Sequence, residues 1–253
     1  MMLNKSKGNM YPWVTHTHAH LGGECLHKCS YCYVNDPRFG RPKKFCGPLW
    51  LMTDELEVKY GKGRIIFIDH CNDLWAEDVP GVFIEMVLDH CAEWPENQYV
   101  FQTKNPDRYI DCIKWMPASC MLGCTIETNR QIPPEISKAP PPISRFLSMC
   151  QLNSSRALFV TIEPIMDFDV DVLGEWLRKI GPEFVNIGAD SKRHGLPEPT
   201  ADKIVALIAL LNTAGIEIRE KHNLERILTE VGRRQGTSSA FGRRTTHREV
   251  GKL

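Results

Sequence analysis

Short apolar runs of strand length alternate along this chain with stretches in which apolar residues recur at helical spacing. We interpret seven runs as strands, at residues 13–20, 64–69, 99–103, 121–126, 157–162, 184–188 and 216–219. Helices are predicted between and after them, near residues 54–61, 80–91, 106–115, 144–150, 172–180, 200–211 and 220–231. Such alternation indicates βαβ units in a parallel sheet. We therefore expect an α/β fold, a partial or near-complete (β/α) TIM-like barrel.

Three of these helices carry further signals. Asp54 and Glu57 resemble a capping box, and Gly61 is a plausible end for the short helix that they begin. Gly181 follows the apolar positions of the helix at 172–180, and glycine is common just past a helix end. The helix at 200–211 is apolar nearly all round, so we expect it to be well buried.

Two segments fall outside the alternation of strands and helices. Residues 21–52 form a long loop with three closely spaced cysteines, and we assign this loop to a barrel domain that covers residues 1–231. Residues 232–253 carry six basic residues and a single acid, Glu249, which gives a net charge of +5 and little to bury. We expect this basic tail to be flexible.

The composition says more about the cellular compartment of the protein than about its binding partners. The 253 residues include 31 basic and 31 acidic side chains, so bulk charge does not indicate nucleic acid. The first ten residues lack the apolar segment of a secretory signal, and the longest apolar run, residues 204–211, is too short to span a bilayer. Ten cysteines in such a chain favour a reducing compartment. We expect a cytoplasmic protein without membrane contact.

The segment of residues 24–33, which we call the cysteine loop, carries the strongest chemical signal. Cys25, Cys29 and Cys32 are spaced as C-x3-C-x2-C, and thiolates this close together are typical metal ligands. Three thiolates would hold a cubane iron–sulfur cluster with one iron left open for another ligand. The alternatives are a zinc site completed by His27 or His20, or three buried thiols without a metal.

The cysteine loop, with Tyr31 just before its last cysteine, resembles the cluster loop of the radical SAM superfamily. Further segments resemble a phage- and prophage-associated subfamily of unknown function: residues 29–33, 67–75, 77–80, 102–108, 123–127 and 162–164, with the strand end at Gly188. They follow one another in the order found in that subfamily. The chain departs from it at residues 15–20, where histidines alternate, and in the basic tail.

The resemblance implies a cofactor pair. Cys25, Cys29 and Cys32 would hold a [4Fe–4S] cluster, and its open iron would bind S-adenosylmethionine. One electron from the cluster would cleave S-adenosylmethionine to methionine and a 5′-deoxyadenosyl radical, which abstracts hydrogen from the substrate. Such an enzyme needs an electron donor such as flavodoxin or ferredoxin.

Charged residues end five consecutive strands, from the second to the sixth, and functional groups gather at the carboxyl ends of barrel strands. The resemblance implies that Asn72 or Asp73 accepts hydrogen bonds from the methionine ammonium group. Glu127 with Thr125 would bind the ribose, and Tyr31 would border the adenine or the cluster. Any one of these residues could instead be a solvent-exposed residue at the start of a loop.

Two further strand-end residues are candidate catalytic groups. Lys104 and Glu163 are placed to face the same mouth of the barrel, where they would bind cofactor carboxylate or substrate. His16, His18 and His20 alternate, so in a strand they share one face. If that face lines the barrel, they could bind substrate or a second metal, whereas facing the helices they would be costly unless paired.

Two weaker candidates have simpler interpretations. The run Lys192-Arg193-His194 could meet a phosphate, although a solvated loop explains it as well. Cys120 and Cys124 could ligate a second cluster, but reduced thiols in the core are the favoured interpretation.

Three functions remain open from the sequence. The first is a radical SAM enzyme that acts on a nucleotide or nucleic acid, which the basic tail favours. The second is a radical SAM enzyme that acts on a small metabolite or peptide. The third is a non-catalytic iron–sulfur or zinc-binding interaction protein, which the charged strand ends disfavour because a structural metal needs no such ring.

Overall fold

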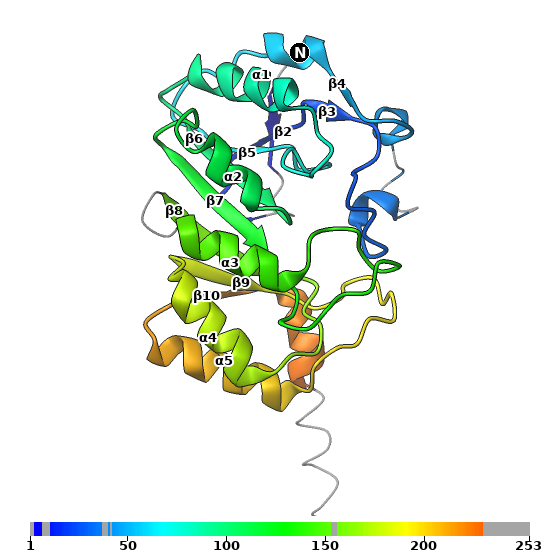
Figure 1. Ribbon diagram of the computed structural model, residues 1–253, viewed down its shortest axis with the longest axis vertical. Coiled ribbons are helices and arrows are strands. Elements are labelled where there is room, and N and C mark those ends of the chain that lie inside the picture. Colours follow the sequence, from blue (N-terminus) through cyan, green and yellow to red (C-terminus); the bar gives the residue numbers. More distant parts are fainter. Residues whose placement is uncertain (1–2, 7–10, 37–39, 41, 153–155, 230–253) are drawn as a thin grey trace, which may run out of the picture.

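The parallel sheet is present and open. The computed structural model describes residues 3–6, 11–36, 40, 42–152 and 156–229 (Figure 1). Eight strands form one sheet in the order β1-β2-β5-β6-β7-β8-β9-β10. They are β1 (Asn4–Lys5), β2 (His16–His18), β5 (Ile65–Ile68), β6 (Gln98–Thr103), β7 (Cys120–Thr125), β8 (Ala157–Ile162), β9 (Phe184–Ile187) and β10 (Glu217–Glu220). All pairs from β2 to β10 are parallel, and β1 is antiparallel to β2.

All seven predicted strands are therefore confirmed, and the fold is an α/β partial barrel. Strand β1, which pairs with β2, was not predicted because two residues carry no periodicity. Within the described residues, the sheet ends at β1 on one side and β10 on the other, so the barrel is open between these strands. The basic tail, residues 232–253, lies outside the described residues.

The main helices follow the strands and cover one face of the sheet (Figure 1). They are α1 (Gly81–Ala92), α2 (Asp107–Cys112), α3 (Pro142–Leu152), α4 (Val170–Ile180) and α5 (Ala201–Thr213). Gly181 ends α4 in the left-handed conformation, with φ 61°, as predicted. Among the described residues, no helix has the length and apolar content that a membrane span requires.

Three helix predictions need correction. The segment after Asp54 forms a 3-10 helix, η4 (Thr53–Glu57), because the N–H of Val58 bonds to the carbonyl of Glu55 three residues back, and it ends before Gly61. Helix α2 is shorter than predicted and ends at Cys112. Helix α5 buries one side only, since Val205 is 56% exposed while Leu207 is fully buried.

The long segment of residues 21–52 is tied at its ends by a hairpin that was not predicted. Strand β3 (Leu21–Gly22) pairs antiparallel with β4 (Trp50–Leu51). The described residues between them include the short 3-10 helices η1 (Tyr33–Asn35) and η3 (Lys43–Phe45). The Trp50 ring lies over Gly22, where a Cβ would come within 2.4 Å of the indole. The hairpin therefore fixes both ends of the segment that carries the cysteine loop.

The histidines of β2 face the helices. In register, His16 lies beside Ile66 and His18 beside Ile68, and both isoleucines belong to the main core on the helix side. Neighbouring residues of a parallel pair share a face. Burial lowers the pKa of His18 to about 2, so this ring is neutral. Of the two alternatives from the sequence, the helix-facing one with paired rings is present.

The inner face of the sheet carries a second, smaller apolar cluster that includes Phe67, Met121, Phe159 and Phe184. The rings of Phe159 and Phe184 stack with centroids 5.2 Å apart. Gly123 leaves the space for Phe159, because a Cβ on Gly123 would lie 2.1 Å from the Phe159 ring.

We predict that Gly123→Ala destabilises the protein by about 1–3 kcal/mol, since the added methyl overpacks a filled interior. Urea denaturation followed by circular dichroism measures the free energy of unfolding. The matched control is Gly81→Ala, because nothing lies within 4 Å of a Cβ at Gly81. Equal stability of the two variants would contradict this account of the inner face.

Candidate functional site

The cysteine loop is held against the loop that follows β7. The N–H of Ser30 donates to the carbonyl of Ile136 at 2.8 Å, and the N–H of Lys138 donates to the carbonyl of His27 at 2.7 Å. Cys29 is buried with Tyr31 and Met166, and Leu196 from the loop after β9 packs against them. Figure 1 shows these loops gathered on one side of the molecule. The loop after β7 thus lines the cysteine loop.

Among the described residues, the three thiols do not form a site for one metal ion. Across the part of the chain that the structure describes, only one set of His, Cys, Asp or Glu groups has all its ligand atoms within 4.8 Å of one another, and the three thiols are not in it. Sulfur ligands of one zinc ion lie about 3.8 Å apart, because each Zn–S bond is about 2.3 Å. In a cubane cluster each thiolate binds a different iron, so the sulfurs lie farther apart. The described thiols therefore form no ready zinc knuckle, and the cluster stays a prediction.

The surroundings of the thiols are mostly apolar, with one hydroxyl in reach. Burial raises the pKa of Cys25, and the nearby Asp73 carboxylate raises it further. Burial also raises the pKa of Cys32. The Cys29 Sγ lies 3.2 Å from the Ser137 hydroxyl oxygen. Without a bound cation, Cys25 and Cys32 are therefore neutral thiols.

His27 is used inside the protein. Its Nε2 lies 2.7 Å from Asp73 Oδ2. The same carboxylate accepts from the Thr103 hydroxyl at 2.8 Å, and from the N–H groups of Lys104 at 2.9 Å and Trp75 at 3.0 Å. This pairing connects the cysteine loop to the ends of β5 and β6.

Asn72 also serves the cysteine segment. Its amide donates to the carbonyl of Gly23 at 3.2 Å, and its side-chain oxygen accepts from the N–H of Asp73 at 2.9 Å. The sequence-based assignment of Asn72 or Asp73 to a methionine ammonium group stays a prediction. In the protein alone, both side chains position the base of the cysteine loop.

Glu127 is the centre of the charged group beside the cysteine loop, and it is fully buried. Its Oε1 accepts from the Tyr31 hydroxyl and lies 2.9 Å from the Lys104 ammonium. Its Oε2 lies 2.7 Å from Arg145 Nη1 of α3. The Lys104 ammonium also lies 5.5 Å from the centroid of the Tyr31 ring.

The two cations decide the charge of this group. Burial alone would raise the pKa of Glu127, but Arg145 and Lys104 outweigh it and hold the pKa at about 2. Burial likewise opposes the charge of Lys104, and the Glu127 carboxylate reverses this and raises the pKa of the ammonium. Glu127 is therefore an anion and Lys104 a cation at neutral pH, as a compensated buried pair requires.

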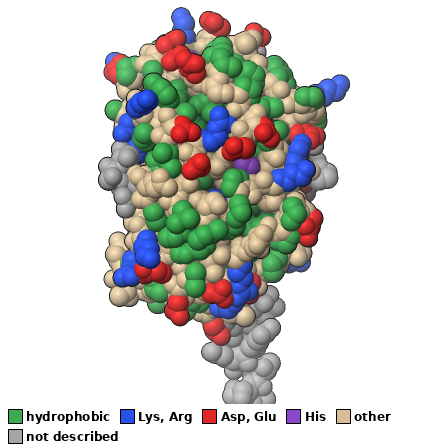
Figure 2. Space-filling view, in the orientation of Figure 1, with side chains coloured by type: hydrophobic (Ala, Val, Ile, Leu, Met, Phe, Trp, Pro, Cys, Tyr) green, Lys and Arg blue, Asp and Glu red, His purple; other side chains and the backbone are tan. Residues whose placement is uncertain are grey.

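Glu163 lies in another ion pair, with Lys221 at 2.5 Å. Polar side chains on the inner face of the sheet are also joined by hydrogen bonds. The Tyr11 hydroxyl donates to Gln102 at 2.6 Å, and the Gln102 amide donates to Thr125 Oγ1 at 2.8 Å. The Asn186 amide donates to Thr161 at 3.1 Å. Figure 2 shows acidic and basic side chains next to one another over the face in view.

The structure thus brings Tyr31, Lys104 and Glu127 into one contact group, which Thr125 joins through its carbonyl, an acceptor for Arg145 at 2.9 Å. Asp73 and Asn72 contact the cysteine segment, and Glu163 lies in its own ion pair. Sequence reasoning missed Arg145, Ser137 and the pairing of His27. Arg145 did carry a signal, because it is spaced three and four residues from Ser148 and Met149 on the buried side of α3.

The weaker candidates are accounted for by contacts within the chain. Lys192 pairs with Asp36 at 2.9 Å, and His194 Nδ1 lies 2.7 Å from the Asp190 carboxylate. Cys120 and Cys124 are buried in the main core, as the favoured interpretation held.

No family model and no curated protein matches this chain. Solved structures do match it. A variant of spore photoproduct lyase gives a TM-score of 0.61 at 10% identity over 87% of this chain and 78% of that chain. A spore photoproduct lyase variant with bound AdoMet and dinucleoside spore photoproduct gives 0.54 at 11% identity over 83% of this chain and 63% of that chain.

A third match is SuiB of Streptococcus suis bound to S-adenosylmethionine, with a TM-score of 0.53 at 10% identity over 85% of this chain and 48% of that chain. This chain therefore spans less than two thirds of the length of two of these three proteins. At such identities the likeness concerns the fold alone, an α/β partial barrel that this chain shares with these proteins.

We predict a pH-dependent contribution of Glu127 to stability. Its pKa is about 2 in the folded protein and 4.5 normally, so the stabilisation is complete above pH 4.5 and is lost as the pH falls toward 2. The shift corresponds to about 3 kcal/mol. Glu127→Gln should therefore be markedly less stable than wild type at pH 7 and differ less at pH 3.

Urea denaturation at both pH values checks this, with Glu85→Gln on the exposed side of α1 as the surface control. A difference between wild type and Glu127→Gln that is the same at pH 7 and pH 3 would show that the carboxylate charge is not what stabilises the fold.

Proposed function

We propose that this chain is a radical SAM enzyme whose cysteine loop holds a [4Fe–4S] cluster. The observation that carries the proposal is the placement of the cysteine loop, with its three thiols, beside a buried charged group at the carboxyl ends of the strands. Two solved structures with the same fold contain bound S-adenosylmethionine, which supports a second cofactor of that chemistry.

The residues fit this pair of cofactors. Three thiols can hold three irons of a cluster and leave the fourth without a protein ligand. When bound, the cluster would supply the electron that cleaves S-adenosylmethionine into methionine and a radical that takes hydrogen from the substrate. The chain's own part is positioning, because Tyr31 lies in the cysteine loop and its hydroxyl is held by Glu127 from β7.

Within this proposal, Lys104 and Glu127 have different roles. Both oxygens of Glu127 are already in contact with Tyr31, Lys104 and Arg145, so the carboxylate acts as a positioning residue for the ammonium and the phenol. Lys104 remains 15% exposed and is the cation available for a carboxylate of cofactor or substrate. Glu163 and Lys221 form a second charged pair that substrate would meet.

The partner and the substrate are finer proposals. The electron would come from a small donor such as flavodoxin or ferredoxin. We propose a nucleotide or nucleic acid as substrate, supported by the basic tail and by the dinucleoside bound to one protein of the same fold. The alternative is a small metabolite or peptide, with the same cofactors.

The cluster proposal is tested by changing Cys25, Cys29 and Cys32 to alanine together. The variant should lose iron, sulfide and the broad absorbance near ~400 nm of anaerobically purified protein, because thiolates hold the cluster. It should also form no 5′-deoxyadenosine from S-adenosylmethionine under reducing conditions. The matched control changes Cys46, Cys112 and Cys150, none of which is fully buried.

If the loop variant keeps its iron and sulfide while the control behaves like wild type, the cluster lies elsewhere, and Cys120 and Cys124 become the next candidates. If both variants lack iron and the wild type does as well, the chain is not an iron–sulfur protein.

The nucleic-acid proposal is tested by truncation after Val231. Each phosphate that a basic residue neutralises releases counterions, so the full-length chain should bind DNA or RNA with a steep salt dependence that the truncated chain lacks. Fluorescence anisotropy across a salt series measures both. Equal affinities would remove the tail from substrate binding and favour a small substrate, while leaving the cluster proposal unaffected.

A further inference from the structure

Three buried histidines meet between the sheet and α1, apart from the cysteine loop. His18 lies on β2, His20 follows that strand, and His90 lies on α1. Their exposed fractions are 2%, 0% and 3%. In the described part of the chain, they are the set of possible metal ligands whose ligand atoms all lie within 4.8 Å of one another.

Each ring has one nitrogen directed at an acceptor outside the cluster. His18 Nε2 lies 3.2 Å from Glu55 Oε2, and His20 Nδ1 lies 3.5 Å from Asp69 Oδ2. His90 Nε2 lies 2.9 Å from the backbone oxygen of Val58. Metal-bound histidines almost always donate their second N–H to a carboxylate or a backbone carbonyl, which fixes the ring and its tautomer. The His18 and His90 rings show this arrangement, and the His20 nitrogen faces the Asp69 carboxylate without a hydrogen bond.

The other three nitrogens converge. His20 Nε2 lies 3.1 Å from His90 Nδ1. The Tyr60 hydroxyl lies 2.6 Å from His18 Nδ1 and 3.0 Å from His20 Nε2. Around a tetrahedral zinc ion with Zn–N bonds of about 2.0–2.1 Å, ligand atoms are about 3.3 Å apart. Small ring movements would therefore place these atoms around one ion.

Without a cation, the three inner nitrogens lack enough hydrogen-bond donors. If each ring donates outward, the three inner nitrogens all carry lone pairs, and only the Tyr60 hydroxyl can supply a hydrogen to them. If His20 instead donates inward to His90, its Nδ1 lone pair faces the lone pairs of Asp69. His20 Nδ1 and Asp69 Oδ2 are both buried without a hydrogen-bond partner. An ion at the centre would allow His20 to donate outward to Asp69.

We propose that His18, His20 and His90 bind one divalent transition-metal ion of the zinc class, with the Tyr60 oxygen beside the fourth position. Imidazole ligands suit zinc and its neighbours, and the set contains no thiolate that would select an iron–sulfur cluster. The site is independent of the proposed cysteine-held cluster, so either can fail without the other.

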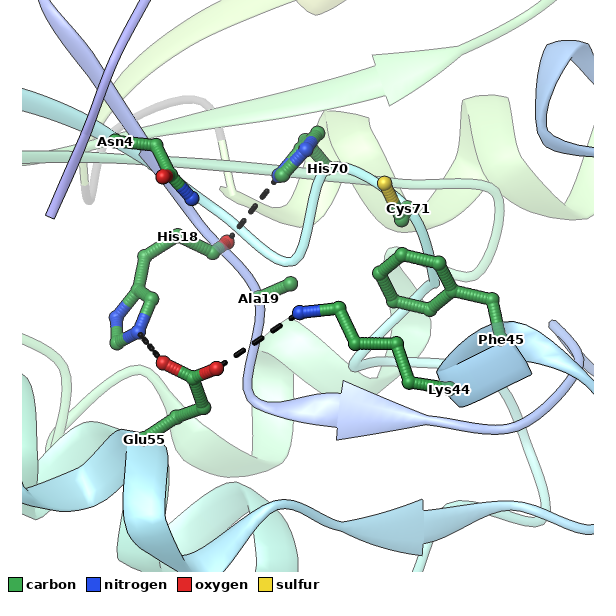
Figure 3. A pocket seen from close by; sticks show the side chains of 8 residues that line it. All are labelled: Asn4, His18, Ala19, Lys44, Phe45, Glu55, His70 and Cys71. Atoms are coloured by element: carbon green, nitrogen blue, oxygen red, sulfur yellow. Dashed lines mark hydrogen bonds and ion pairs between the residues drawn. The ribbon is translucent and has the colours of Figure 1, made fainter. Parts of the chain in front are cut away.

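A pocket of about 170 Å³ lies beside this site and has His18 in its lining. Its lining includes His18, Glu55, Lys44 and His70, and Figure 3 shows the His18 ring directed at the Glu55 carboxylate with Lys44 on the other side of it. The Lys44 ammonium lies 3.8 Å from Glu55. His18 is thus the member of the set that meets the pocket.

Such an ion would fix the start of the segment that carries the cysteines. His20 directly precedes β3 of the hairpin, and Asp69 Oδ1 accepts from the N–H groups of His20 and Leu21 at 2.8 and 2.9 Å. The metal would link this point to α1 and, through Glu55 and Val58, to the η4 region. We assign the site a structural role at the base of the cysteine loop.

The test uses the full chain with Cys25, Cys29 and Cys32 changed to alanine, so that thiolates do not compete. Titration with cobalt(II) should give one equivalent with the visible bands of four-coordinate cobalt and no sulfur-to-cobalt charge-transfer band. Calorimetric titration with zinc should give the same stoichiometry, and zinc should raise the melting temperature because it binds only the folded state.

The variants His18→Gln and His90→Gln should each lose the stoichiometric binding and the rise in melting temperature. The control is His16→Gln, which lies on the same strand outside the cluster and should bind as before. Asp69→Asn keeps an oxygen for the N–H groups of His20 and Leu21 but cannot accept from His20 Nδ1, and it should weaken zinc binding by about 10–100-fold.

Absence of stoichiometric zinc and cobalt binding would overturn the proposal, and the three histidines would then be a buried hydrogen-bonded group without a metal. Unchanged binding in His90→Gln and Asp69→Asn would place the ion elsewhere. If a histidine variant does not fold, Asp69→Asn with the metal stoichiometry of the parent chain still decides between these outcomes.

Discussion

The burial of the Glu127 carboxylate is the constraint that organises the carboxyl end of this barrel. A fully buried charge costs several kcal/mol unless partners surround it. Here the partners come from three separate segments: Tyr31 from the cysteine loop, Lys104 from the end of β6 and Arg145 from α3. Because the buried charge is compensated by all three partners, the position of the cysteine loop depends on the packing of β6, β7 and α3.

The same reasoning changes the meaning of the charges at the strand ends. A ring of charged residues around a barrel mouth suggests a polar ligand, yet most of these charges are neutralised within the chain. Asp73 faces His27, Glu163 faces Lys221, and Asp190 faces His194. Their first role is to hold loops in place. A ligand can therefore contact only the members of such pairs that stay partly exposed. The Lys104 ammonium is the clearest case.

The sequence was sufficient for the repeating part of the fold and for the cysteine loop. Seven strands were predictable because buried parallel strands are continuous apolar runs, and the thiol spacing is a local pattern. The partners of Glu127 were only partly predictable. Tyr31 and Lys104 lie next to motif residues, whereas Arg145 reaches Glu127 through tertiary packing, which no local spacing records. The β3–β4 hairpin depends on two residues at each end, too few to show a period.

The alternating histidines are a case in which a sequence pattern predicts a shared face correctly but does not say which face of the sheet it is. Period-two spacing places His16 and His18 on one face, but only the register with Ile66 and Ile68 decides which face it is. Facing the helices, His18 and His20 meet His90 some seventy positions away, in an apolar layer where unpaired rings would be costly.

The chain therefore separates two groups of candidate metal ligands that lie close in sequence. Four residues divide His20 from Cys25, yet the imidazoles point toward α1 and the thiols lie among the loops at the strand ends. Soft thiolates select iron–sulfur clusters, and imidazoles suit zinc-class ions. Because the hairpin begins between the two groups, the fold itself keeps them from sharing one ion, and each group can meet the metal that its own ligands favour.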